Sequence, residues 1–134
     1  MKKTITKEFI FDASHRLLDK DLCEEDNFDV FGKCYNFPSH GHTYHLFVTV
    51  SGEEQHGMIM NFSDLKLAVQ KLILDKFDHN FINDIPEMKD KITTCETMVD
   101  VFWELLNQWF IKINITLEEI KLYETPTSFT TLTK

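Results

Sequence analysis

The sequence contains few cysteines, glycines and prolines, and it has no long hydrophobic run. Three cysteines make a disulfide framework unexpected, so a reduced, cytoplasmic protein is predicted. No apolar stretch approaches the roughly 20 residues that a membrane-spanning helix needs, and residues 1–8 lack the hydrophobic segment of a signal peptide. With four glycines, three prolines and no repeat or flexible linker, the chain shows no boundary, and one domain over residues 1–134 is expected.

Positive charge is also scarce. Lys and Arg together number 14 against 22 Asp and Glu, which gives a formal net charge of -8. This balance argues against non-specific nucleic-acid binding and against attachment to an anionic membrane surface. Hydrophobic residues at 43% and charged residues at 27% are typical of a folded globular domain.

Alternating apolar residues predict strands, and apolar residues three or four apart predict helices. The predicted strands are residues 4–11, residues 43–51, a strand that contains Ile120 and Leu122, and residues 129–133. The predicted helices are residues 63–77, capped by Asn61 or Ser63, and a helix that begins near Thr93 or Thr94 with a capping box over residues 93–96. This order indicates an α+β fold with helices on one face of an antiparallel sheet. About 30 residues between the first two strands show no clear period, and such long segments are usually functional.

Histidines gather where the first two predicted strands meet. His40 and His42 precede the second strand, and residues i and i+2 of an extended chain point to the same side. His15 follows the first strand, so pairing of the two strands would bring it to the same end of the sheet. Three neutral imidazoles with one coordination position left open describe a catalytic zinc site. Solvent-exposed loop histidines are the alternative.

Among the cysteines, Cys34 is the best candidate for a nucleophile or a general base. It lies beside Lys33 in a polar loop that leads to the histidines, and a nearby cation favours the thiolate. Burial as a small hydrophobic residue is the alternative. Cys23 lies in an acidic run, whereas Cys95 lies at a helix start, where the thiolate is also favoured.

Further titratable residues leave two interpretations open. Asp78 and His79 end the first predicted helix, where His79 either complements the helix dipole or works with Asp78 in proton transfer. Glu124 ends a predicted strand, as a solvated carboxylate or as the acceptor of two hydrogen bonds from an amidine-like ligand edge. Glu96 is either a member of the capping box or a ligand contact.

These pieces together resemble the 6-pyruvoyl-tetrahydropterin synthase family, which includes the 6-carboxytetrahydropterin synthases of the queuosine pathway. The matching segments, which follow one another over nearly the whole chain, are residues 11–17, 32–34, 40–44, 57–62, 77–80 and 122–125. The resemblance implies the tunnelling fold (T-fold), a four-stranded antiparallel sheet with two helices on one face in the order ββααββ. It also implies homo-oligomers, trimers or hexamers, with active sites between subunits.

The resemblance further implies a carbon–oxygen lyase that acts on 7,8-dihydroneopterin triphosphate and eliminates triphosphate without an external redox cofactor. The product would be 6-pyruvoyl-tetrahydropterin, for tetrahydrobiopterin, or 6-carboxy-tetrahydropterin, for queuosine. The spacing from Cys34 to His40 resembles the biopterin branch but does not settle the product. The implied zinc ligands are His15, His40 and His42.

The remaining roles come from the same resemblance. Cys34 would abstract a proton, and Asp78 with His79 would form a proton relay contributed by a neighbouring subunit. Glu124 would anchor the pterin ring and join that relay, and Glu96 would be a further pterin contact.

Charge leads to a separate hypothesis. A triphosphate carries about four negative charges near neutral pH, whereas this chain is itself acidic, so local cations are required. Arg16, the only arginine, follows His15, and Lys33 precedes Cys34. We predict that one or both bind the triphosphate. Two other functions fit the same residues: a zinc hydrolase that uses a metal-activated water, and a pterin-binding module without turnover.

Overall fold

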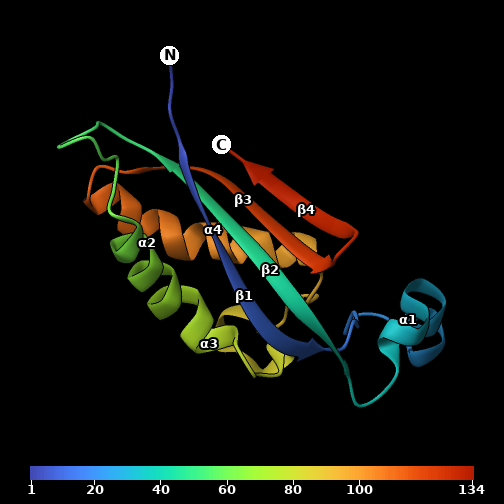
Figure 1. The fold of residues 1–134 in the computed structure, drawn as a ribbon. Coiled ribbons are helices and arrows are strands. Elements are labelled where there is room, and N and C mark those ends of the chain that lie inside the picture. Colours follow the sequence, from blue (N-terminus) through green and yellow to red (C-terminus); the bar gives the residue numbers. More distant parts are fainter.

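The computed structural model describes residues 1–134. It contains a four-stranded antiparallel sheet with the strand order β1-β2-β3-β4 (Figure 1). The strands are β1 (Ile5–His15), β2 (His40–Ser51), β3 (Thr116–Thr125) and β4 (Ser128–Thr133). β1 and β4 are the two edges, because each pairs with only one neighbour. The predicted four-stranded antiparallel sheet is therefore confirmed.

Helices connect the strands. α2 (Phe62–Val69), a π-helical turn (Gln70–Leu74) and α3 (Asp75–Phe77) form one continuous helical run after β2. Two short 3₁₀ turns, Ile82–Asp84 and Pro86–Met88, precede α4 (Cys95–Lys112), and α4 leads to β3. α1 (Glu24–Phe31) and a 3₁₀ turn (Gly32–Tyr35) lie between β1 and β2. None of these helices combines the length and the apolar character needed to cross a bilayer.

One hydrophobic core joins the sheet to the helices. Every second residue of β2 from Tyr44 to Val50 is fully buried, and these side chains belong to one cluster with Leu65 of α2 and Phe102 of α4. Figure 1 shows α2 and α4 on the same side of the sheet, which we call the inner face. Phe11 of β1 stacks on Tyr44 with 5.0 Å between the ring centroids, so both strands pack into this core.

Two local predictions were wrong. The segment between the first two strands, expected to lack regular structure, contains α1, so the chain has a helix there in addition to the predicted elements. Only Asn27 of α1 is buried, and for that reason no apolar stripe marks the helix in the sequence. α4 begins after Thr94, as predicted, and the Thr94 side chain accepts a hydrogen bond from the Thr97 N–H, so Thr97 and not Glu96 takes the third helical position and the capping box over residues 93–96 does not form.

Candidate active site

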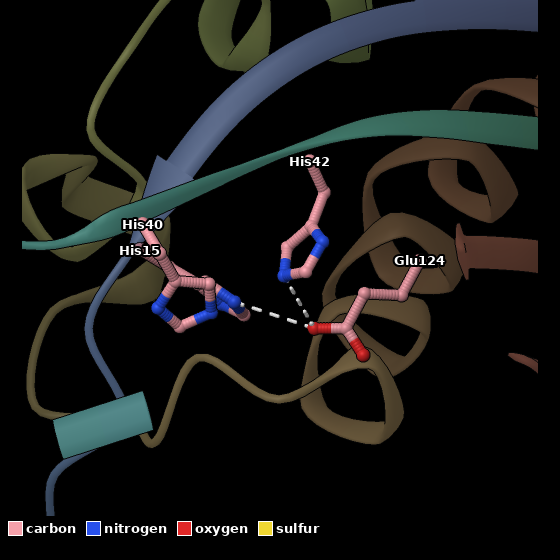
Figure 2. Close-up of side chains that lie close together, drawn as sticks. All are labelled: His15, His40, His42 and Glu124. Carbon is pink, nitrogen blue, oxygen red and sulfur yellow. Dashed lines mark ion pairs between the residues drawn. The ribbon is translucent and has the colours of Figure 1, made fainter. Parts of the chain in front are cut away.

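Three histidines converge at one end of the inner sheet face. β1 extends to His15 and β2 begins at His40, so the predicted metal ligands lie within the strands rather than in loops beside them. His15 is opposite His40 in the register of the two strands, and Ala13 is opposite His42. The ring centroids are 4.6 Å (His15–His40), 5.1 Å (His15–His42) and 4.9 Å (His40–His42) apart, and Figure 2 shows the three rings close together. Strand pairing thus assembles a compact triangle of imidazoles.

The backbone holds His15 in one orientation. Its side chain is fully buried, and its Nδ1 lies 2.7 Å from the carbonyl oxygen of Thr93. A carbonyl oxygen only accepts hydrogen bonds, so Nδ1 carries the hydrogen, and a neutral His15 presents the lone pair of Nε2 to the cluster. Nε2 of His15 and Nε2 of His42 are both buried without a hydrogen-bond partner. A bonded outer nitrogen and a free inner lone pair are typical of a metal-binding histidine.

Glu124 completes the cluster from β3. The pairing of β3 with β4 is irregular between Tyr123 and Thr125, on either side of this residue. Oε1 of Glu124 lies 3.3 Å from Nε2 of His15 and 3.2 Å from Nε2 of His42 (Figure 2). A hydrogen bond from the His15 ring, which forms only when Nε2 carries a proton and not a metal ion, is the main reason why the pKa of Glu124 lies below its ordinary value, so this carboxylate is ionised at neutral pH.

The donor atoms of this cluster fit a divalent metal ion such as zinc. One ligand atom from each of the three histidines and from Glu124 lies within 4.8 Å of all the others. The pKa values of His40 and His42 are both lowered, mainly because burial disfavours the charged ring, so both rings are neutral at pH 7. Lone pairs and an anionic oxygen that face one another repel unless a cation lies between them. Zinc prefers nitrogen and oxygen donors of this kind.

Cys34 is not part of the histidine cluster. It lies in the 3₁₀ turn after α1 and is a half-buried free thiol. The N–H of Leu17 donates a hydrogen bond of 2.9 Å to the Cys34 carbonyl oxygen, which ties the turn to the chain just after β1.

The other two cysteines lie in different surroundings. Burial raises the pKa of Cys95 to about 11, so this thiol stays protonated. Cys23 is exposed and its sulfur caps α1.

Asp78 and His79 form a second polar group at the end of α3. Nδ1 of His79 lies 2.9 Å from Oδ1 of Asp78, and the backbone N–H of Asp12 donates to the same oxygen at 3.0 Å. The His79 N–H donates to the Asp12 carbonyl oxygen at 2.6 Å, so β1 fixes the pair from both sides. A groove of ≈ 480 Å³ is lined by His79 and also by His42. His79, but not Asp78, therefore borders the same surface groove as His42.

The other predicted site residues lie near these groups or on the surface. The guanidinium of Arg16 lies 4.3 Å from the ring centroid of Tyr35, and its Nε donates to the Tyr35 carbonyl oxygen at 2.6 Å. These contacts leave the two terminal nitrogens of Arg16 available to an anion. Lys33 is exposed beside Cys34, and Glu96 is exposed in the first turn of α4.

Two groups at this site were not predicted from the sequence. The carbonyl group of Thr93 orients His15, and no sequence pattern identifies a backbone acceptor. Tyr44 follows His42 on the inner face with 5.7 Å between the ring centroids, and its buried hydroxyl has no hydrogen-bond partner. Strand alternation is the signal that would have placed Tyr44 beside the histidines.

Sequence comparison with known proteins identifies the family. The family described as 6-pyruvoyl tetrahydropterin synthase matches residues 4–134. The chain belongs to this family of lyases. It is 39% identical over 134 residues to the 6-pyruvoyl tetrahydrobiopterin synthase of Dictyostelium discoideum, and the alignment covers 96% of each chain. It is also 36% identical to the 6-carboxy-5,6,7,8-tetrahydropterin synthase of Haemophilus influenzae, over 93% of this chain and 94% of that protein.

A solved structure supports the same conclusion. The 6-pyruvoyl tetrahydropterin synthase of Caenorhabditis elegans superposes with a TM-score of 0.88 and 27% identity, over 98% of this chain and 95% of that chain. The predicted family, its lyase class and its α+β fold are therefore confirmed.

Proposed function

We propose that the chain is a zinc-dependent pterin synthase that acts on 7,8-dihydroneopterin triphosphate and eliminates triphosphate. The product would be the 6-pyruvoyl or the 6-carboxy tetrahydropterin, since relatives named for each are similar to nearly the whole chain. The observation that carries the proposal is the triangle of His15, His40 and His42, in which two buried Nε2 atoms lack a partner. Three free cysteines favour a reducing compartment such as the cytoplasm.

The proposed chemistry divides between the histidine cluster and the groups around it. The three histidines would hold zinc, which supplies Lewis-acid polarisation of the substrate's side-chain oxygens when bound. Cys34 would take the proton from the side-chain carbon, because a thiol exchanges protons close to working pH. Asp78 holds the ring of His79 through the 2.9 Å contact, and His79 would pass protons to and from the site that it shares with a neighbouring subunit.

Glu124 would anchor the pterin ring. An ionised carboxylate accepts two charge-assisted hydrogen bonds from an amidine-like edge, and the lowered pKa of Glu124 keeps it ionised. Its contacts with His15 and His42 place this anchor beside the proposed zinc ligands. The ring and the reacting side chain of one substrate would therefore be held by adjacent groups. Glu96 would be a further pterin contact from α4.

The same proposal includes trimers or hexamers with active sites between subunits. β1 and β4 leave two strand edges in each chain, and an edge strand is a template for pairing with another chain. Pairing of β4 with β1 of the next copy, repeated around a rotation axis, would join the sheets into a closed ring. Asp78 and His79 of one subunit would then serve Cys34 of its neighbour.

Mixed oligomers should recover activity that two single variants lack. Cys34→Ala and His79→Ala chains are each expected to be inactive, but random mixing leaves about a quarter of shared sites with both native residues. Product formation after subunit exchange, followed by native mass spectrometry of the mixed oligomers, measures this. If exchanged oligomers stayed inactive, both residues would belong to one subunit.

Lys33→Ala is expected to raise the KM for the triphosphate substrate several-fold and to leave kcat unchanged, because a surface cation steers an anion rather than reacting with it. Arg16→Ala should act in the same direction through its free terminal nitrogens. Both variants should weaken the dependence of KM on salt concentration, since screening acts on the charge that was removed. Steady-state kinetics over a salt series is the measurement, and an unchanged KM and salt slope would exclude the residue concerned.

The proposed function is tested by supplying the substrate. The purified, zinc-loaded protein is incubated with 7,8-dihydroneopterin triphosphate, and the pterin product and released triphosphate are identified by mass. A 6-pyruvoyl or 6-carboxy product supports the proposal and names the branch. Hydrolysis of the triphosphate with the pterin side chain intact would instead indicate a zinc hydrolase, and tight binding without turnover would indicate a pterin-binding module.

A further inference from the structure

Asn83 binds the backbone next to the buried histidine of the cluster. It lies in the 3₁₀ turn Ile82–Asp84, far from β1 in sequence. The N–H of Arg16 donates to Oδ1 of Asn83 at 3.0 Å, and Nδ2 of Asn83 donates to the Arg16 carbonyl oxygen at 2.8 Å. One carboxamide thus satisfies both backbone groups of the residue that follows His15, and its donor and acceptor match the two partners.

Thr93 connects this contact to the ring of His15. Thr93 is fully buried, and its Oγ1 lies 3.4 Å from both the Arg16 carbonyl oxygen and Oδ1 of Asn83. Its own carbonyl oxygen takes the hydrogen bond from Nδ1 of His15 at 2.7 Å. Three segments therefore meet around His15: the end of β1, the turn that holds Asn83, and the residue before the cap of α4.

We propose that Asn83 is a positioning residue that sets the orientation of His15 toward the metal. The inference rests on the zinc site of the proposed function. Asn83 belongs neither to the histidine cluster nor to the lining of the groove beside His42 and His79, so it acts through Arg16 and Thr93. The hydrogen bond from His15 to Thr93 requires the end of β1 and residue 93 to keep a fixed separation, and the Asn83 carboxamide would hold it through its bonds to the Arg16 backbone and its contact with Oγ1 of Thr93. Outer partners of metal ligands typically change metal affinity about 10–100-fold.

The test is the metal affinity of Asn83→Ala, measured without substrate. Metal-free protein is titrated with Zn²⁺ against a chromophoric competing chelator, and we expect binding about 10–100-fold weaker than in the wild type. The Co²⁺-substituted protein should show shifted or weakened visible absorption bands, because the ligand geometry has changed. Asn61→Ala is the matched control. It removes two side-chain hydrogen bonds to Ser63 at the start of α2, away from the site, and should leave zinc affinity and the Co²⁺ spectrum unchanged.

A second variant covers failure of Asn83→Ala to fold. Asn83→Asp keeps the shape and the acceptor for the Arg16 N–H but replaces the donor with a carboxylate oxygen that repels the Arg16 carbonyl oxygen, so it should also weaken zinc binding. Wild-type zinc affinity and an unchanged Co²⁺ spectrum in either variant would contradict the positioning role of Asn83 but not the proposed function. Absence of zinc binding by the wild type would instead overturn the proposed function.

Discussion

Replacing His42 with alanine is expected to remove the bound metal and, with it, measurable turnover. His42 supplies one of three imidazoles in the cluster, and its Nε2 is buried with no hydrogen-bond partner in the protein. The zinc affinity should therefore fall by more than the roughly 10–100-fold that outer partners cause. Zinc content by elemental analysis and product formation are the two measurements. Removing zinc from the wild type with a chelator should have the same effect on turnover, and re-addition should reverse it.

Thermal unfolding gives an independent measure of the same loss. Zinc that binds only the folded chain stabilises it by about 4 kcal/mol at a thousandfold excess over Kd, so the wild-type Tm should rise with added zinc. The Tm of His42→Ala should not respond.

His45→Ala is the matched control for this change. His45 lies on the same strand three residues later, on the outer face, where its Nδ1 is 3.4 Å from Oε1 of Glu8. This variant should keep its zinc, its turnover and its Tm response. Stoichiometric zinc in His42→Ala, or loss of zinc in His45→Ala, would contradict the assignment of the cluster as the metal site.

Replacing Cys34 with alanine should lower kcat by about 10²–10⁴-fold, the usual contribution of a general base. Zinc content should not change, since Cys34 lies outside the cluster that would hold the metal. KM should also change little, because the base acts on the reacting carbon and not on the triphosphate or the pterin ring. Steady-state kinetics with product identification, together with zinc analysis of the same sample, separates these effects.

Cys23→Ala tests whether the effect belongs to this thiol. Cys23 is an exposed cysteine that caps α1, so its loss should leave kcat unchanged. If Cys34→Ala retained most of its activity, the proton would be taken by another group, and a hydrolase that uses metal-activated water would fit better than a lyase. The two cysteine variants therefore separate the enzyme classes that the sequence alone left open.

The histidine triangle could be predicted because it depends on short-range rules. Residues two apart on a strand share a face, and the ends of two paired strands are neighbours, so His15, His40 and His42 were expected together. The structure changes one detail: the histidines lie inside longer strands, and the register pairs His15 with His40. Side chains within strands are held more rigidly than loop residues, which suits a site that must present three lone pairs to one ion.

The surroundings of the triangle could not be predicted in the same way. On its own residue type and position, Glu124 was left between a solvated carboxylate and a ligand anchor, and only the packing of β3 against β2 brings it within 3.3 Å of His15. Helix α1 was missed because it buries almost none of its side chains and therefore lacks the apolar period that marks a helix. Arg16 was assigned by charge alone, whereas its stacking on Tyr35 appears only when the turn before β2 folds back on β1.

Residue types and spacing were enough to predict the family, the strands of the sheet and the meeting of His15, His40 and His42, because strand alternation and the pairing of consecutive strands are simple rules. The roles of Cys34, Asp78 and His79 stay predictions. The hydrogen bond from His15 to Thr93 joins residues 78 positions apart, and the hydrogen bond between Arg16 and Asn83 joins residues 67 positions apart. Such contacts depend on how β1, the turn at Asn83 and the start of α4 pack together. Each of these hydrogen bonds joins a side chain to a backbone group. Every residue carries such backbone groups, so no local sequence pattern predicts which of them will be the partner.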